Sequence, residues 1–239
     1  MVADDHGGAR QSQSQSQSLS QSTSQSQSQT SGNWLLENYQ CDGFYDESVS
    51  PDGAARPHCT ALLDTVSQLS AEDIRRRQAA ADHALMRLGI TFNVYGAKEG
   101  TERIIPFDVL PRMMPSSEWD WIERGLKQRI FALNKFIDDL YHNQHILRDK
   151  IIPEQVIGSA ASLRQQCVGI DPPQGIWCHI TGTDLVRGGD GQIYVLEDNL
   201  RCPSGVSYVL QNRQLMKQTF PHLFEHMRVR PVFDYPSRL

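Results

Sequence analysis

The sequence predicts an α+β fold, in which a helical amino-terminal region with a β-hairpin is followed by an antiparallel sheet. Apolar residues recur at steps of three and four from Trp119 to Leu140, which is typical of a long amphipathic helix. Two β-branched and aromatic runs flank a turn with glycines at residues 96–100, which indicates a hairpin. From Ile176 onward, strand-like runs are separated by tight turns.

The bulk composition is that of a globular protein and argues against several classes of partner. The 239 residues are 39% hydrophobic and 21% charged, and the net charge is −5, so no basic field favours nucleic acid. No apolar run has the length of a signal sequence core or a membrane span. Five dispersed cysteines without a C-x-x-C pair predict reduced thiols. We therefore expect a cytoplasmic protein with no nucleic-acid partner and no membrane partner.

Composition also divides the chain into three regions. Residues 11–31 are Gln, Ser or Thr at every position except Leu19. Such a segment has too little apolar area to offset a chain entropy of about 1–2 kcal/mol per residue. We predict a disordered Gln/Ser-rich tail at 1–33, a mainly helical region at 34–155 and a strand-bearing lobe at 156–239. The tail is interpreted as a tether, with a glutamine-rich interaction segment as the alternative.

Capping residues and apolar periodicity predict the helices. Ser70 and Asp73 form a capping box and Gly89 supplies a left-handed stop, so a helix is expected between them. A longer helix is expected to begin at Ser116 or the next residue, and a short one after Pro153. The apolar residues expected to face the core of the two longer helices are Ile74, Ala81, Leu85 and Leu88, and then Trp119, Ile122, Leu126, Ile130, Leu133, Ile137 and Leu140.

Two extended segments are expected around the turn at 96–100. Residues 90–95 alternate and are rich in β-branched and aromatic types, which predicts a strand. Residues 103–109 return as a second extended segment. Pro106 cannot donate to a ladder, so the second segment is expected to be an edge strand or irregular.

The residues with the clearest chemical pattern lie on two β-rich runs around a Gly-Gly-Asp-Gly turn. This pattern predicts a hairpin with a four-residue loop at 188–191. Glu197 and Asn199 are two residues apart and therefore share one face of their strand. If Arg187 pairs with Gln192, Asp184 lies opposite Val195 and shares that face, together with Ile180, Val186 and Ile193. A slip of one residue would move Asp184 to the other face.

Two convergent carboxylates need a cation or a proton between them. At 4 Å they repel by about 1 kcal/mol in water and by about 4 kcal/mol at an effective dielectric constant of 20. Two carboxylates and one amide form an all-oxygen set that suits Mg²⁺, and no His or Cys at matching positions favours zinc. Arg187 and Arg201 flank the acids and are candidates for binding phosphate oxygens. The alternative interpretation is ordinary surface polarity.

The segment Leu196-Glu-Asp-Asn-Leu-Arg-Cys-Pro-Ser-Gly-Val-Ser-Tyr208 resembles the hallmark of the circularly permuted ATP-grasp proteins, a family related to glutathionylspermidine synthase. The resemblance covers nearly everything from Cys41 to Leu239. Further segments that carry it are Tyr45-Asp-Glu47, Arg56-Pro-His58, Gly89 to Gly96, Gly100 to Asp108, Pro111-Arg112, Glu118-Trp119 through Gln128-Arg129, and Ala132-Leu-Asn134.

The resemblance implies an ATP-dependent carboxylate–amine ligase that works through an acyl-phosphate intermediate, with an unknown carboxylate and amine as substrates. It implies that Asp184, Glu197 and Asn199 hold Mg²⁺ on the ATP phosphates. Arg201 is then the first candidate, and Arg187 the second, for contacts to phosphate or acyl phosphate.

Two further groups of residues belong to segments that carry the resemblance. Ser204 and Gly205 are candidates for approaching the nucleotide through backbone N–H groups, and a purely structural turn is the alternative. Glu102, Arg103 and Arg112 receive no functional role, and buried ion pairs are their expected use.

The resemblance also implies that family members continue well beyond the equivalent of residues 235–239. The strand-bearing lobe is therefore expected to be an incomplete, antiparallel ATP-grasp-type sheet lobe. The isolated chain is expected to be inactive, and a separately encoded second half is a candidate partner. A truncated, non-catalytic remnant that acts as a binding module is the alternative, and a metal-dependent hydrolase that uses Asp184 and Glu197 as acid and base is a third interpretation.

Overall fold

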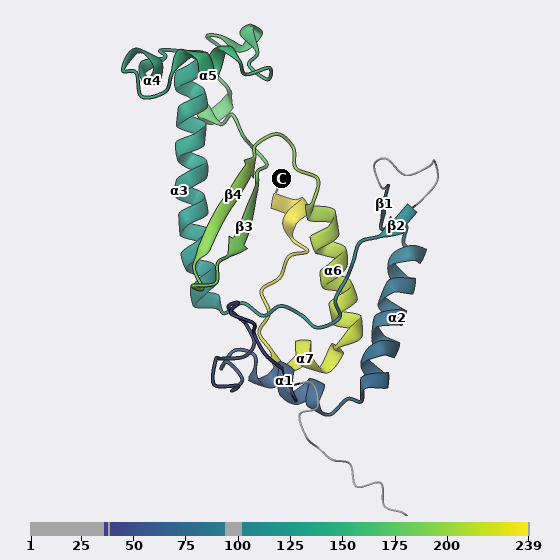
Figure 1. Cartoon of the computed structure of the whole chain (residues 1–239). Helices are drawn as coiled ribbons and strands as arrows, with labels where there is room; N and C mark the ends of the chain where they lie inside the picture. The colour runs from purple at the N-terminus through teal and green to yellow at the C-terminus, as the bar shows by residue number, and fades with distance from the viewer. Residues whose placement is uncertain (1–35, 38, 94–101, 239) are drawn as a thin grey trace, which may run out of the picture. The chain divides into compact units, whose positions relative to one another are not determined.

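A computed structural model describes residues 36–37, 39–93 and 102–238, and the predicted tail and hairpin turn lie outside these residues. The described part is a mixed α+β structure with seven α-helices and two antiparallel sheets of two strands each (Figure 1). The helices are α1 (Thr60–Ser67), α2 (Ala71–Arg87), α3 (Ser116–Tyr141), α4 (His145–Arg148), α5 (Glu154–Gly158), α6 (Val206–Thr219) and α7 (Pro221–His226). The strands are β1 (Thr91–Asn93), β2 (Glu102–Ile104), β3 (Gly182–Arg187) and β4 (Ile193–Asn199), and short 3₁₀ turns lie at Gln165–Cys167, Pro173–Gly175 and Tyr235–Arg238.

Helix α2 begins and ends where its capping residues predict. The Ser70 hydroxyl accepts from the Asp73 backbone N–H, and the Asp73 carboxylate accepts from the Ser70 backbone N–H in return. Gly89, just after the helix, has φ +66°, which is the expected left-handed stop. Ala81 and Leu85 are buried as predicted, whereas the prediction for Leu88 is wrong because that side chain is 60% exposed.

Helix α3 begins at Ser116, as predicted, and runs for 26 residues. Its apolar stripe is covered only in part: Ile122 and Leu140 are buried, most of the stripe between them is half-buried, and Trp119 is exposed. The prediction that the whole stripe faces the core is therefore wrong at Trp119. The short helix predicted after Pro153 is α5.

The main core lies among the first two helices and the last two. Leu62 and Val66 of α1, Leu85 of α2 and Leu215 of α6 belong to one buried cluster. Val109, from the irregular segment after β2, completes it and is 1% exposed. Burying such side chains stabilises the fold by about 1.5–3 kcal/mol each. Helix α2 contacts α6, and α1 contacts α7, so the last two helices of the described residues pack on the first two (Figure 1).

Helices α6 and α7 correct the expectation that the chain is strand-like from Ile176 onward. The run Val206-Ser-Tyr-Val209 has strand-forming residue types, but the next eight residues are mostly good helix formers. The helix buries Leu215 against the core. Tertiary packing and the later residues therefore decide against a strand at its start.

The second strand of the first hairpin ends earlier than predicted. Strands β1 and β2 pair antiparallel from Thr91↔Ile104 to Asn93↔Glu102, and residues 94–95 of the expected strand lie outside the described part. Strand β2 ends before Pro106, and the chain after it is irregular up to α3.

The second hairpin, β3–β4, lies along α3 (Figure 1). The Asn134 side-chain oxygen on α3 accepts from the backbone N–H groups of Trp177 and Cys178, at 2.8 and 3.0 Å, just before β3. Arg129 of α3 donates to Asp198 of β4 at 2.7 Å. These bonds fix the hairpin on the helix and leave its other face free.

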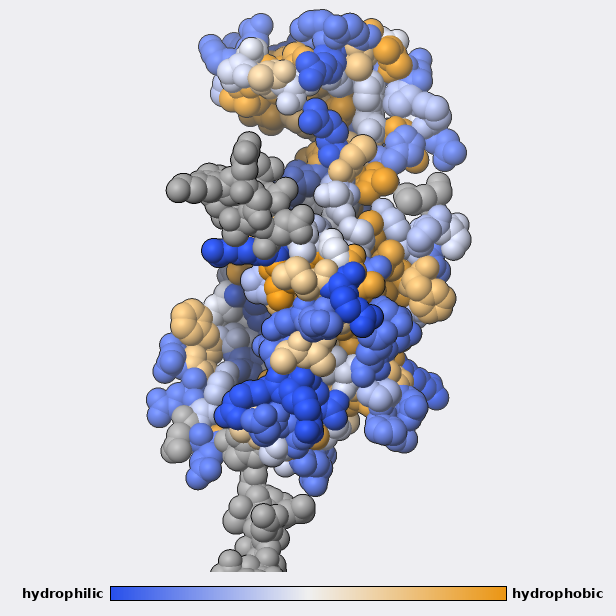
Figure 2. Space-filling model, turned by 90° about the vertical axis from the view of Figure 1, so that its right-hand side faces the viewer, coloured by the Kyte–Doolittle hydropathy of each residue, from blue (hydrophilic) through white to orange (hydrophobic). Residues whose placement is uncertain are grey.

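Three general features of the described residues remain: the hydropathy of the helices, the state of the cysteines and the exposure of apolar side chains. No helix among the described residues is long and apolar enough to cross a membrane. The five cysteines are free thiols. The segment around α4 and α5 exposes Ile151, Val156, Val168 and Ile170, and apolar side chains are visible at the corresponding end in Figure 2.

Candidate functional site

The register of the β3–β4 hairpin differs from the predicted one and contains a β-bulge. Arg187 pairs with Ile193, so the loop is one residue longer than expected. The extra loop residue is Gln192, whose backbone N–H is bound by the Asp190 carboxylate at 3.0 Å. This is the one-residue slip that would carry Asp184 to the other face. The slip is compensated because the ladder shifts between Asp184 and Leu185.

The bulge returns Asp184 to the face of Glu197. Val195 pairs with Leu185, the next pair is Asp184↔Glu197, and Leu196 is the additional residue, 69% exposed. The expectation that Asp184 lies opposite Val195 is thus wrong, and Ile193 and Val195 lie on the half-buried face. Val186 does share the exposed face.

Asp184, Glu197 and Asn199 converge at one end of this exposed face. The Asn199 Nδ2 group lies 3.0 Å from Glu197 Oε1 and 3.3 Å from Asp184 Oδ2, so one amide donates to both carboxylates. All three residues are exposed. Among the described residues no cluster of three or more His, Cys, Asp and Glu is arranged to hold a metal ion. An ion held here by the two carboxylates could take the Asn199 amide oxygen as a third protein ligand.

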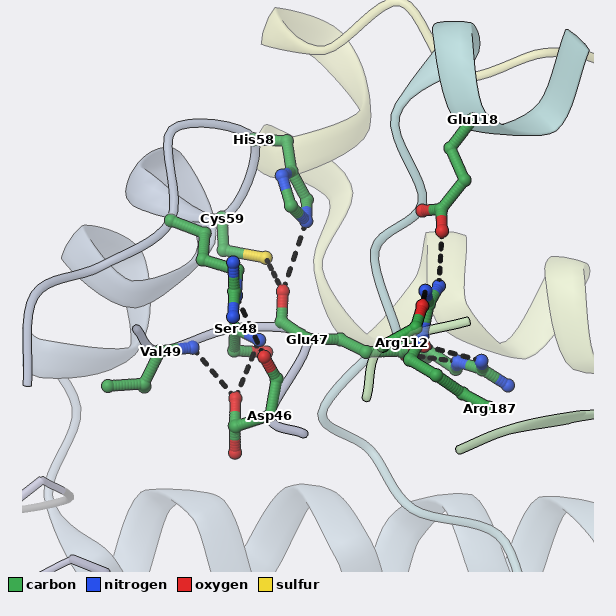
Figure 3. A network of polar contacts seen from close by, with 11 residues as sticks. Asp46, Glu47, Ser48, Val49, His58, Cys59, Arg112, Glu118 and Arg187 are labelled. Atoms are coloured by element: carbon green, nitrogen blue, oxygen red, sulfur yellow. Dashed lines mark hydrogen bonds and ion pairs between the residues drawn. The ribbon is translucent and has the colours of Figure 1, made fainter. Parts of the chain in front are cut away.

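The opposite face of the hairpin is closed by ion pairs, and Arg187 lies there. Its side chain is 9% exposed, lies 2.6 Å from Glu118 Oε1 at the start of α3 and bonds to Glu47 (Figure 3). It also donates to the Gly191 carbonyl at 2.8 Å. The structure therefore does not bring Arg187 to the face that carries Asp184.

Glu47 is the centre of this network. It accepts from Arg112 as well as Arg187, and its backbone oxygen lies 3.0 Å from His58 Nε2 (Figure 3). Burial raises the pKa of the Glu47 carboxyl, but the bonds from the two guanidinium groups outweigh burial and hold that pKa below its usual value. Arg112 forms an ion pair as expected, but the expectation that the pair is buried is wrong for Arg112, whose side chain is 59% exposed. Arg103 is exposed, and it has no partner among the residues that the structure describes.

The segment that precedes α6 packs against the end of the hairpin that holds the acids. An added Cβ at Gly182 would lie 3.0 Å from Pro203 Cβ, and Gly182 pairs with Asn199. Gly205 is the N-cap residue of α6, and both Ser204 and Gly205 are exposed. The first backbone N–H groups of a helix lack acceptors within it, so they offer donors and a partial positive charge beside the acids.

Arg201 lies between the acids and this helix. Its side chain is exposed, and it has no hydrogen-bond or ion-pair partner among the residues that the structure describes. Cys202 has φ +47°, which turns the chain sharply after Arg201. The free guanidinium of Arg201 contrasts with the fully engaged one of Arg187.

Sequence reasoning gave no roles to the residues that hold the hairpin in place. Glu47, Glu118, Arg129 and Asn134 all lie in segments that carry the family resemblance, but no local pattern shows which side chains meet. Their bonds join positions far apart in the sequence, for example Glu47 and Arg187, which are 140 residues apart. The resemblance of the segments was the one signal that pointed to them.

Comparison with known proteins identifies the family. The model of the circularly permuted ATP-grasp type 2 family matches residues 111–239, which are more than half of the chain. The chain belongs to this family. The matched residues include α3, the β3–β4 hairpin and α6, and therefore the whole cluster of Asp184, Glu197 and Asn199.

Several longer proteins are similar to the chain. It is 50% identical to an uncharacterized protein of Synechocystis over 204 residues, which are 85% of this chain and 42% of the relative. An uncharacterized protein of Mycobacterium tuberculosis is 40% identical over 88% of the chain and 38% of its own length. A Frankia alni protein named "Putative glutamate--cysteine ligase 2-3" is 40% identical over 79% of the chain and 22% of its own length. The chain thus spans less than half of each of these relatives.

Proposed function

We propose that this chain carries the metal-binding strands of an ATP-dependent carboxylate–amine ligase, in which Asp184, Glu197 and Asn199 hold Mg²⁺ on the phosphates of ATP. The observation that carries the proposal is the convergence of these three side chains through the Asn199 amide. Membership of the ATP-grasp family supports ATP as the nucleotide. The exposed position of the cluster leaves room for phosphate oxygens and water to complete the coordination of the ion.

The donor set fits Mg²⁺ after one simple rearrangement. Rotation of the Asn199 amide by half a turn exchanges its nitrogen for its oxygen and presents a third oxygen between the two carboxylates. Mg²⁺ prefers oxygen ligands and is commonly held by one or two carboxylates together with substrate phosphates. A bound ion would neutralise charge on the phosphates during transfer.

The chain's own groups around the acids fit phosphate binding. We propose that Arg201 contacts phosphate or acyl phosphate, because its guanidinium has no partner among the described residues and Arg201 follows the acidic strand. Ser204 and Gly205 present backbone N–H groups at the start of α6, a position that favours anions. Arg187 is reassigned from phosphate contact to positioning, since its ion pairs with Glu47 and Glu118 hold β3 in place.

The proposed reaction has two steps. A carboxylate oxygen of one substrate attacks the γ-phosphorus of ATP, ADP leaves, and an acyl phosphate forms. The nitrogen of an amine then attacks the acyl carbon, inorganic phosphate leaves, and the amine loses a proton as the amide bond forms. The name of the Frankia relative is that of an enzyme joining two amino acids, which supports this reaction class.

The organisation of the chain follows from this proposal. We propose that residues 156–239 form part of an antiparallel ATP-grasp-type lobe, after a mainly helical region at 34–155. We expect the remaining nucleotide contacts in sequence that corresponds to the unmatched parts of the longer relatives. That sequence lies either in the same polypeptide as the residues described here or in a separately encoded second half. The two-stranded sheet of the described residues leaves Val186 and Tyr194 exposed, as expected for a lobe that has further partners.

The metal assignment is tested on the 239-residue chain with Mn²⁺, a paramagnetic ion that accepts the same oxygen ligands as Mg²⁺. In nuclear magnetic resonance spectra, Mn²⁺ should broaden backbone signals of β3 and β4 near the cluster. Glu197→Ala and Asn199→Ala should each remove this broadening, whereas Asp149→Ala, an exposed acid just after α4, should leave it unchanged. Unchanged broadening in both cluster variants would refute the metal site.

The ligase assignment is tested on the full-length Synechocystis relative. ATP consumption is measured with pools of amino acids, peptides and polyamines, with and without Mg²⁺. We expect ADP release that needs both a carboxylate and an amine. Failure to consume ATP with every pool, while metal binding persists, would favour the alternative of a non-catalytic binding module.

A further inference from the structure

A second candidate site is a cavity beside β3, on the side of the loop that carries Glu47. Its volume is about 690 Å³, within the roughly 300–1,000 Å³ range of small-molecule sites. It is lined by the 45–49 loop, by α1, by residues 108–112 and by Leu185, Val186 and Arg187 of β3. Leu185 directly follows Asp184 in the chain, but successive side chains of a strand point to opposite faces, so Leu185 faces away from the proposed metal site.

The cavity combines an apolar wall with charged groups. Leu62, Leu63 and Val66 of α1 are buried and line it, together with Leu185 from the opposite side. Three of its lining residues are acids (Asp46, Glu47 and Asp108) and two are arginines (Arg112 and Arg187). A ligand with two or more negative charges would be repelled by this excess of acids.

Most of these charges are already satisfied. Asp46 accepts from the backbone N–H groups of Ser48 and Val49 at 2.6 and 2.7 Å, and its bond from Tyr39 raises the pKa of that tyrosine to about 12. Arg187 forms ion pairs with both Glu47 and Glu118, so these charges have partners. These groups build the cavity wall and have little capacity left for a ligand.

Two charged groups of opposite sign have free capacity. Asp108 is exposed, and among the described residues only its Oδ1 atom is used, as an acceptor from the Leu110 N–H at 2.8 Å. Arg112 bonds to Glu47 through Nε and Nη2, so its Nη1 group remains without a partner among the described residues. Its side chain is 59% exposed. One free acceptor and one free donor, both charged, match a ligand that carries both signs.

We propose that this cavity binds an α-amino acid with an apolar side chain. The ligand carboxylate bonds to Arg112 Nη1, the ligand ammonium bonds to Asp108 Oδ2, and the apolar side chain packs against the wall of Leu62, Leu63, Val66 and Leu185. The inference deepens the proposed function and rests on it only for the role of the ligand as a substrate, because binding itself requires neither ATP nor Mg²⁺.

The test uses the 239-residue chain without metal or nucleotide and four probes. L-Leucine carries both charges and an apolar side chain, N-acetyl-L-leucine lacks the ammonium, L-leucinamide lacks the carboxylate, and glycine lacks the side chain. Affinities are measured by calorimetric titration or by saturation-transfer resonance experiments. We expect L-leucine to bind at millimolar concentration or tighter and each of the other three to bind about tenfold more weakly.

Variants assign the two contacts. Asp108→Asn should remove the preference for L-leucine over N-acetyl-L-leucine, and this change is mild because the asparagine oxygen can still accept from Leu110. Arg112→Gln should remove the preference for L-leucine over L-leucinamide. The matched control Asp149→Asn replaces an exposed acid remote in sequence from the cavity-lining residues and should change neither preference.

Three outcomes overturn the proposal: no L-leucine binding at about 10 mM, equal affinity for the capped probes, or unchanged preferences in Asp108→Asn. The outcome is separate from that of the metal test. Leucine binding without Mn²⁺ broadening would leave the cavity assignment standing and sink the ligase proposal. Mn²⁺ broadening without leucine binding would do the reverse.

Discussion

The two faces of the β3–β4 hairpin differ in how their charged side chains are satisfied. On the half-buried face, Arg187 and Asp198 are bound by partners from α3 and from the 45–49 loop. On the exposed face, Asp184 and Glu197 share only the amide of Asn199 among the described residues. Charges on the first face have protein partners that fix the fold, whereas those on the second face keep their coordination capacity. That contrast separates residues that hold the site from residues that could act in it.

The largest loss of stability is expected when Arg187, on the half-buried face of the hairpin, is replaced. Arg187→Met removes a side chain that is 9% exposed and leaves Glu47 and Glu118 without their shared partner. We expect a loss of about 3 kcal/mol in the free energy of unfolding, measured by urea denaturation. Arg112→Met is the matched control, because Arg112 also pairs with Glu47 but is 59% exposed, and should cost below about 1 kcal/mol. Equal losses would show that burial does not distinguish the two pairs.

A backbone change in the hairpin loop should have the next largest effect. Gly191 has φ +80°, and an added Cβ would lie 2.7 Å from the Tyr45 ring. Gly191→Ala should therefore cost about 1–3 kcal/mol in thermal or urea unfolding. Gly189→Ala, two residues earlier, meets no atom closer than 3.6 Å and should cost below about 0.5 kcal/mol. A tolerated alanine at 191 would contradict the close packing of Tyr45 on the loop.

The ion pairs on the half-buried face of the hairpin should also make the stability of the protein depend on pH. The folded-state pKa of Glu47 is held below the ordinary value of about 4.3. Its ionised form therefore contributes stability that is complete above that ordinary value and is lost as the pH falls through the lower folded-state value. The free energy of unfolding, measured with urea, should fall more steeply below about pH 5 for the native chain than for Glu47→Gln. Parallel pH profiles would remove Glu47 from the network.

The smallest effect on stability is expected on the exposed face. Glu197→Gln removes one of two neighbouring negative charges and keeps the shape of the side chain, so the unfolding free energy without metal should change by less than about 0.5 kcal/mol. The same variant should weaken Mn²⁺ binding strongly. A large stability loss would mean that Glu197, like Arg187, belongs to the structural network.

Part of this structure could be predicted from the sequence because the signals are local. The capping box at Ser70 and the stop at Gly89 lie next to the helix ends that they set. The start of α3 follows Pro115, and the apolar step of three and four predicted that the segment after it is helical. The residues of the candidate site were found the same way, since Glu197 and Asn199 share a face whatever the strand pairs with. Helices α6 and α7 were missed because the start of α6 has strand-forming residues and its burial depends on α1 and α2.

The sequence by itself determined which side chains carry the chemistry, because residue type and alternation along one strand need no knowledge of the partner. Only the tertiary structure decided that Asp184 meets them, since the predicted register was wrong by one residue and a bulge at Leu196 returned Asp184 to the face of Glu197. It also decided that Arg187 is structural, through contacts with Glu47 and Glu118. Such contacts join residues far apart in the chain, and folding, rather than local pattern, brings them within bonding distance.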